Sequence, residues 1–184
     1  MKCKSLLLSI IFGLVASPQA SASYVTVPNY FVAISNKTSV PADILYALAA
    51  KETNVKMNNG TVAPWPYTLN VHGRGYWYAS YEDMMAAAYD FLNEGITSID
   101  IGLFQVNWRW NGHRVQSIEE LGEPKTNGVV AAQILLEHYQ NHRDWAVAAG
   151  RYHNPANRDG RADRYAKEFS EFLALIQRGQ YQQR

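Results

Sequence analysis

The sequence has too few cysteines for a disulfide scaffold, and it has no long apolar run. Its single cysteine is Cys3, and a domain of about 160 residues can bury enough core to fold without a disulfide. The most apolar stretch covers residues 6–16, which is well short of the roughly 20 residues that span a bilayer. These absences exclude a disulfide-dependent fold and predict that the chain has no membrane anchor.

The apolar stretch is typical of a secretory signal peptide. Two lysines precede it, and the small residues Ala-Ser-Ala at positions 20–22 follow it, which is the pattern of a cleavable signal. Cys3 lies before the stretch, whereas a lipid-modified cysteine would lie after it. We therefore predict a signal peptide at residues 1–22 and a single secreted domain at residues 23–184.

The chain also lacks an excess of charge of either sign. Its 17 lysines and arginines and its 16 aspartates and glutamates leave a formal net charge of +1, unlike the basic balance of a nucleic-acid-binding domain. His138 and His142 stand four residues apart without forming an H-E-x-x-H motif, and cations near a helix end are the simpler interpretation. We expect no nucleic-acid partner, no metal and no cofactor.

The residue pattern predicts an α+β, mainly α, fold. Alternating residues at 64–80 break at the turn-forming residues 72–75, which predicts a small β-hairpin element. Ser80 is placed to cap the helix after the hairpin, and Asn127 is placed to cap the helix that comes next. Apolar residues at helical spacing predict five helices, at residues 41–53, 81–94, 128–140, 144–152 and 161–177.

Glu52 lies where the apolar face of the first predicted helix ends in a carboxylate. Ile44, Leu45 and Leu48 share that face, so the Glu52 carboxyl is expected to be partly desolvated, which disfavours its charged form. A carboxylic acid that stays protonated is what the cleavage of a glycosidic bond needs at the leaving oxygen. The alternative is that Glu52 lies at the rim of the apolar face and is simply solvated.

Polar residues interrupt the otherwise apolar stretch SIDIGLFQVNW, residues 98–108. They are Asp100, Gln105 and Asn107, and buried polar groups of this kind must find partners. The hydroxyl and acetamido groups of a polysaccharide would supply such partners, and so would the backbone of a core turn. Aromatic residues of the predicted hairpin are candidates either for sugar stacking or for its small core: Trp65, Tyr67, Tyr76, Trp77 and Tyr78.

Three motifs resemble, in the same order, those of lytic transglycosylases with the lysozyme-like fold. They are KET at residues 51–53 after an apolar helix, DIGLFQVN at residues 100–107, and AAGRYHNP at residues 148–155 before a final amphipathic helix. The similarity covers residues 40–176, which is most of the predicted domain. The resemblance implies a lysozyme-like fold and peptidoglycan glycan strands as the substrate.

For the catalytic acid, the resemblance implies that Glu52 is the acid/base and that the hydroxyl of Tyr152 lies near it and helps to hold it. Thr53 stands where serine is usual after the catalytic glutamate, a change that keeps the hydroxyl. His153 and Asn154 follow Tyr152 and are candidates for substrate contact or for shaping the next loop.

For the glycan cleft, the resemblance implies that Phe104, Gln105 and Asn107 bind substrate. Gly102 matches a position where the missing side chain lets backbone and sugar approach closely. Phe104 stands where methionine is common, which we expect to alter the wall of a sugar subsite.

Asp100 separates two mechanisms. The stretch around it also resembles animal-type lysozymes, in which an aspartate at this place is the second carboxylate of the active site and serves as nucleophile or charge stabiliser. A lytic transglycosylase does without that group, because the C6 hydroxyl of the muramic residue attacks its own C1. Asp100 would then bind substrate or stabilise a turn.

The sequence thus predicts a lytic transglycosylase that cleaves between N-acetylmuramic acid and N-acetylglucosamine and leaves a 1,6-anhydro end. Residues 64–78 and 151–153 resemble the specialised members that accompany type IV secretion and conjugation machinery. We therefore expect a periplasmic monomer, with components of such machinery as candidate partners. The alternatives are a hydrolytic muramidase and a non-catalytic glycan-binding assembly protein.

Overall fold

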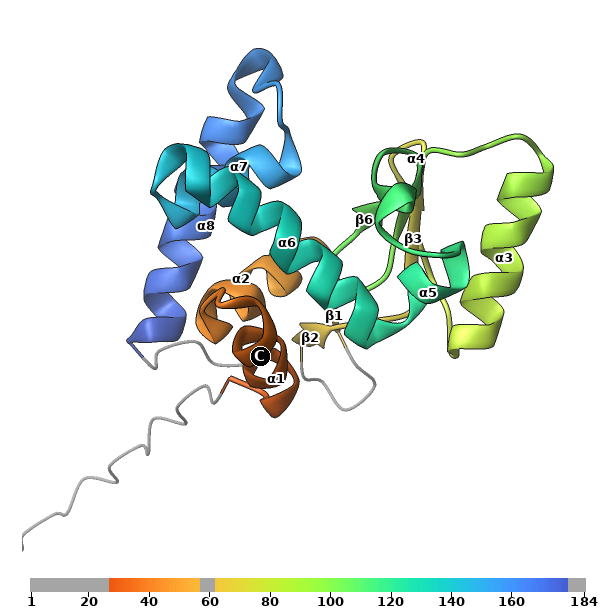
Figure 1. The fold of residues 1–184 in the computed structure, drawn as a ribbon, viewed down its shortest axis with the longest axis horizontal. Coiled ribbons are helices and arrows are strands. Elements are labelled where there is room, and N and C mark those ends of the chain that lie inside the picture. Colours follow the sequence, from red (N-terminus) through yellow and green to blue (C-terminus); the bar gives the residue numbers. More distant parts are fainter. Residues whose placement is uncertain (1–26, 57–61, 179–184) are drawn as a thin grey trace, which may run out of the picture.

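The computed structural model describes residues 27–56 and 62–178. The predicted signal peptide at residues 1–22 lies outside these ranges and stays a prediction. Within the described ranges, no helix is both long and apolar enough to cross a membrane. Figure 1 shows a helical part and a sheet part, with helix α6 running between them.

Helix α2, Ala42–Thr53, is the centre of the helical part. All of its residues from 44 to 50 are buried, and a helix that is apolar all round belongs inside a core. Helices α1, Asn29–Thr38, and α8, Arg161–Gln177, pack against it. The last turn of α2 therefore leaves the core at a fixed place, and Glu52 lies in that turn.

Helices α6, Pro124–His142, and α7, Trp145–His153, complete the helical part. The side chain of Asp144 caps α7 by accepting hydrogen bonds from two backbone N–H groups of its first turn. Helices α7 and α8 come close at Gly150, where a Cβ atom would lie only 2.3 Å from the carbonyl oxygen of Ala162. The predicted first, fourth and fifth helices are confirmed, whereas α1 was not predicted.

The sheet part is a four-stranded antiparallel sheet with the strand order β4-β3-β5-β6. Its strands are β3, Thr68–Val71; β4, Arg74–Trp77; β5, Ile99–Ile101; and β6, Val106–Asn107. Strands β1, Asn54–Lys56, and β2, Val62–Pro64, form a separate pair. The predicted hairpin is confirmed as β3 and β4, and the β element is larger than predicted because β5 and β6 add to it.

The remaining helices follow strands of the sheet, with one between β4 and β5 and the others after β6. Helix α3, Tyr81–Asn93, begins at Ser80, whose side chain accepts a hydrogen bond from the backbone N–H of Asp83, as predicted. Helix α4, Trp108–Asn111, the 3₁₀ turn η1, Gly112–Arg114, and helix α5, Ile118–Gly122, lead from the sheet to α6. A second 3₁₀ turn, η2, Arg158–Gly160, precedes α8.

Asn127 does not cap a helix, so this prediction was wrong. Helix α6 begins at Pro124 rather than at residue 128, because proline is pre-organised for the first helical position. Asn127 therefore lies inside the helix, and it is fully buried. Its amide accepts a hydrogen bond from the backbone N–H of Phe104 (3.0 Å) and donates to the carbonyls of Ile101 (2.9 Å) and Leu121 (3.1 Å).

The loop between β5 and β6, residues 102–105, makes hydrogen bonds with side chains of four different elements. Its Phe104 N–H donates one of them to the side-chain oxygen of Asn127 on α6. Hydroxyl groups donate to the loop carbonyls from the other three: Thr68 of β3 to Gly102 (3.1 Å), Thr53 of α2 to Leu103 (2.9 Å) and Tyr152 of α7 to Phe104 (2.8 Å). The loop thus fixes both parts of the molecule relative to each other.

We expect Asn127→Ala to lower the free energy of unfolding by about 2–4 kcal/mol, because it leaves three buried backbone groups without a partner. Urea unfolding measures this loss. Gln133→Ala, an exposed position on the same helix, is the control and should change the free energy by less than about 0.5 kcal/mol. A loss for Asn127→Ala no larger than that of the control would contradict the role of the buried amide.

Candidate active site

A row of residues across the sheet forms one wall of the site. In the strand register, Gly75 pairs with Asn70, Asn70 with Asp100, and Asp100 with Asn107. Their neighbours along β3 and β5 are buried apolar residues, and successive side chains of a strand point to opposite faces. The polar residues of the 98–108 stretch therefore project from the sheet away from the core.

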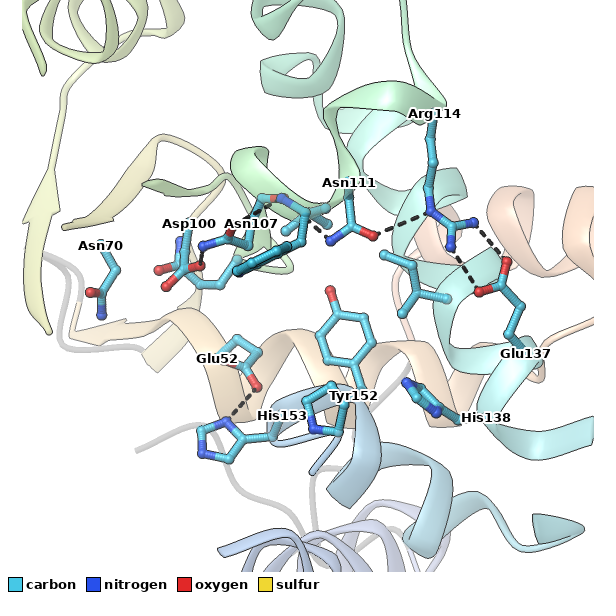
Figure 2. Close-up of a pocket in the computed structure, with 15 residues that line it drawn as sticks. Glu52, Asn70, Asp100, Asn107, Asn111, Arg114, Glu137, His138, Tyr152 and His153 are labelled. Carbon is cyan, nitrogen blue, oxygen red and sulfur yellow. Dashed lines mark hydrogen bonds and ion pairs between the residues drawn. The ribbon is translucent and has the colours of Figure 1, made fainter. Parts of the chain in front are cut away.

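The row faces a cleft between the sheet and the helices, with a volume of about 550 Å³ (Figure 2). Glu52 lies at its floor, and Asp100 lies across from it on β5. Residues from six further elements complete the lining, which consists of Asn70, Gln105, Val106, Asn107, Trp110, Asn111, Arg114, Ile134, Glu137, His138, Tyr152, His153 and Pro155.

A second cavity of about 210 Å³ shares Glu52, Asn70 and Gln105 with the cleft and reaches Trp77 on β4. A Cβ atom on Gly75 would lie 2.8 Å from the Trp77 ring, so the indole lies against the backbone there. The Trp77 residue is nevertheless 60% exposed. This geometry suits a platform for a sugar ring, whereas Trp65 donates its indole N–H to the carbonyl of Tyr78 (2.8 Å) and belongs to the hairpin structure.

The carboxyl group of Glu52 is largely buried, with 14% of its side chain exposed. The hydroxyl of Tyr165 on α8 donates a hydrogen bond to Glu52 Oε1 (2.7 Å). The imidazole Nδ1 of His153 lies 3.8 Å from the same oxygen. Glu52 is therefore neither the fully solvated residue of the alternative interpretation nor an isolated buried charge.

Tyr165 is the tyrosine that holds Glu52, which corrects the role predicted for Tyr152. The hydroxyl of Tyr152 donates instead to the carbonyl of Phe104 (2.8 Å), although Tyr152 does line the cleft. The ring of Tyr165 stacks on His153 with 4.4 Å between ring centroids. Burial and the nearby Glu52 raise the pKa of Tyr165 well above its ordinary value, so its phenol remains a hydrogen-bond donor.

Asp100 is held by the amide of Asn107, whose Nδ2 donates to its Oδ1 at 2.7 Å. Burial raises the pKa of the Asp100 carboxyl above its ordinary value. The hydrogen bond from Asn107 opposes this rise, the negative charge of Glu52 adds to it, and His153 opposes it. Asp100 is thus a carboxyl whose protonated form is favoured more than in water.

Three predicted substrate contacts lie elsewhere. Phe104 is fully buried and packs on the ring of Phe31, so its side chain is part of the core and not of a subsite wall. Gly102 has a φ of +78°, and its missing Cβ makes room for the amide of Asn127, not for a sugar. Asn154 accepts a hydrogen bond from the Arg158 N–H and shapes the loop after α7.

The other predicted residues do reach the cleft. Gln105 lines both cavities, and its Nε2 donates to the hydroxyl of Thr68 (2.9 Å) and to the carbonyl of Gly102 (3.0 Å). The side-chain Oδ1 of Asn107 also accepts a hydrogen bond from the N–H of Trp110 at the start of α4. His153 lines the cleft beside Glu52.

Several cleft residues were missed. The alternation in TLNV, residues 68–71, was a signal for Asn70, because its neighbours on both sides are apolar. Tyr165 gave no signal of its own, since it lies on the apolar face of the last predicted helix together with core residues. His138 was interpreted as a cation near a helix end, with a metal ligand as the alternative, and it lines the cleft.

Nothing in the described ranges gathers three side chains suited to hold a metal ion. Burial lowers the pKa of His138 below its ordinary value, so this imidazole is neutral at physiological pH.

The central helix of the helical part ends in a carboxylate, which faces a small antiparallel sheet across a cleft. This arrangement is that of the lysozyme-like fold. The chain belongs to the Transglycosylase SLT domain family, which it matches over residues 29–174. No curated protein and no solved structure gave a match to the chain. Membership of the family supports a lytic transglycosylase activity on peptidoglycan.

We expect Tyr165→Phe to lower kcat on peptidoglycan by about 10- to 100-fold, because it removes a hydrogen bond to a charged group. Turnover by the folded variant measures the loss. Tyr152→Phe is the matched control, since it loses a bond to a backbone carbonyl instead. It should lower the free energy of unfolding, and it should lower kcat less than Tyr165→Phe does. If Tyr152→Phe lost more kcat than Tyr165→Phe, the assignment of the two tyrosines would be wrong.

We expect Asp100→Asn to be more stable than the wild type at pH 7. A carboxyl with a raised pKa favours the folded state at low pH, and this contribution is lost as pH rises through the folded-state pKa. The amide does not ionise, so the stability difference should shrink as pH falls toward the ordinary value of 3.8. Urea unfolding at pH 7 and pH 4 measures this stability difference, and the exposed Asp90→Asn is the control. A stability difference of equal size at both pH values would contradict the prediction.

Proposed function

We propose that the protein cleaves the β-1,4 bond between N-acetylmuramic acid and N-acetylglucosamine with formation of 1,6-anhydro-N-acetylmuramic acid. The observation that carries the proposal is the geometry of the two cleft carboxyls. Tyr165 donates a hydrogen bond to Glu52 at the end of a buried helix, whereas the amide of Asn107 binds Asp100. Glu52 is therefore placed to act as the single acid/base that the intramolecular reaction requires.

In the proposed reaction, Glu52 transfers its proton to the bridging oxygen as the bond from that oxygen to C1 of the muramic residue breaks. Positive charge develops on the sugar ring, and the leaving N-acetylglucosamine takes the proton. The Glu52 carboxylate then removes the proton from the C6 hydroxyl of the same muramic residue, and O6 bonds to C1. Water is not consumed, and Glu52 ends protonated as it began.

The surroundings of Glu52 support both halves of this cycle. The two polar contacts described for its carboxyl fall on Oε1, which leaves Oε2 to exchange the proton with the substrate. The Tyr165 bond holds the carboxyl in one orientation through both halves. Tyr165 is a positioning residue, since it acts through Glu52.

A hydrolytic muramidase is the second candidate, because Asp100 lies across the cleft from Glu52 (Figure 2). In that reaction Asp100 acts as an ionised nucleophile or charge stabiliser. Burial raises the pKa of Asp100 and so makes its ionised form less favourable, which favours a substrate-binding role instead. The third alternative is a glycan-binding assembly protein, and it assigns no role to the contact between Tyr165 and Glu52.

Mass spectrometry of muropeptides released from purified peptidoglycan tests the proposal. We expect products that are one water lighter than hydrolytic products, and we expect Glu52→Gln to lower their rate by at least about 10²- to 10⁴-fold, because the general acid/base is gone. Glu171→Gln, an exposed position on α8, is the control and should keep full activity.

Each other outcome of this experiment points to one alternative. Reducing muramic ends that disappear in Asp100→Asn would establish a muramidase. Release of no product by the wild type, with glycan binding retained, would establish a binding protein. Full activity in Glu52→Gln would defeat the catalytic role of this residue.

We further propose that the protein works in the periplasm as a monomer and opens the wall locally for a conjugation or secretion apparatus. The support is the signal pattern at residues 1–22 and the resemblance of residues 64–78 and 151–153 to the specialised members of the superfamily. Periplasmic extraction by osmotic shock tests the location, and recovery of uncleaved protein from the cytoplasm would contradict it.

A further inference from the structure

The cleft extends well beyond the two carboxyls that the reaction involves. Figure 2 shows Arg114, Glu137 and His138 on the far side of Tyr152 from Asp100, and Asn111 between Asn107 and Arg114. We call this group the charged end of the cleft. The pyranose rings and acetamido groups of a glycan carry no formal charge, so cleavage of the glycosidic bond gives no reason for an ion pair there.

The ion pair at the charged end is held in a fixed geometry. Arg114 donates from its two terminal nitrogens to the two oxygens of Glu137, at 2.7 and 2.8 Å, and from Nε to the side-chain oxygen of Asn111 at 3.2 Å. A guanidinium has five N–H donors, so two remain for a ligand. The carboxylate of Glu137 likewise keeps lone pairs for a second donor.

Both members of the pair are reachable and charged. The side chain of Glu137 is 53% exposed and that of Arg114 is 21% exposed, and both line the cleft. The bond from Arg114 lowers the pKa of Glu137, so this carboxylate is ionised at neutral pH. His138, whose pKa is lowered by burial, adds a neutral donor and acceptor rather than another charge.

A ligand that fits this end carries a carboxylate and an ammonium group a short distance apart. The muramic residue of peptidoglycan bears such a group: a short peptide, linked through its lactyl ether, that has free carboxylates and, in its diamino acid, an amine. The peptide leaves the sugar at C3, and Glu52, Arg114 and Glu137 line the same cleft.

We propose that the charged end of the cleft binds the stem peptide of the muramic residue, with a peptide carboxylate on Arg114 and the peptide ammonium on Glu137. The inference rests on the proposed function and adds a preference for strands that carry peptides over strands from which they have been removed. A purely structural ion pair, which ties the η1 turn to α6, is the competing interpretation.

The charge-swapped double variant Arg114→Glu/Glu137→Arg separates these interpretations. It restores an ion pair between the η1 turn and α6 but reverses the charge that each position presents to a ligand. We would measure kcat/KM on soluble glycan strands with stem peptides and on the same strands after amidase treatment. Arg114→Gln and Glu137→Gln complete the set, and Arg161→Gln, whose side chain is 61% exposed and lies outside the cleft lining, controls for loss of positive charge.

For the wild type, we expect kcat/KM to be higher on peptide-bearing strands. In the two single variants and in the swap, this preference should fall about tenfold, the size of one hydrogen bond to a charged group, while Arg161→Gln keeps it. The swap should recover the thermal stability that the single variants lose. Equal losses on both substrates, or a swap that recovers the preference together with stability, would overturn the proposal.

Failure of the proposed function gives a different result from failure of this inference. If the wild type releases no product from either substrate, the function fails, and calorimetric binding of the same two strand preparations then decides the inference. Tighter binding of peptide-bearing strands by the wild type but not by the swap supports it. Equal binding by both proteins overturns it.

Discussion

The need to satisfy buried backbone groups in the 102–105 loop governs the architecture of this protein. The loop turns sharply, with positive φ at Gly102 and at Gln105. One backbone bond, from the Gln105 N–H to the Gly102 carbonyl, closes it, and the Phe104 N–H and the Leu103 and Phe104 carbonyls bond to side chains. Side chains from α2, β3, α6 and α7 supply the missing partners. An unpaired buried polar group costs about 1–3 kcal/mol, so the four elements are constrained to meet at this loop.

The site follows from that meeting point. Thr53 binds the loop and is the residue after Glu52, so the loop determines where the acid lies. Tyr152 binds the loop and is the residue before His153, which stacks on Tyr165 and lies near the Glu52 carboxyl. Tyr152 both bonds the loop and lines the cleft, and Gln105 of the loop lines both cavities. The loop therefore fixes the positions of the groups that a substrate meets.

The cleft divides into regions with different chemistry. Glu52 and Asp100 face each other at its centre, Trp77 offers an open ring in the adjoining cavity, and Arg114 with Glu137 forms a charged end. Both central carboxyls are partly buried, and the charge of Glu52 adds to the rise in the pKa of Asp100 that burial causes. An active site of this kind gives up some stability in exchange for reactivity, whereas the charged end has its ion pair already satisfied.

The sequence by itself determined the class of fold, four of the five predicted helices within about a residue or two at their ends, the hairpin and the candidate acid. These depend on local periodicity, on capping residues and on ordered motifs, all of which are visible in a short window. Only the tertiary structure decided that Tyr165 rather than Tyr152 holds Glu52, that Asn127 is a buried connector rather than a cap, and that Phe104 belongs to the core. The physical reason is that a periodic pattern says which face of a helix is buried, but not which distant polar group the buried face will meet. Such pairs are decided by how the elements pack, and here Tyr165 and Glu52 are brought together only when α8 closes on α2.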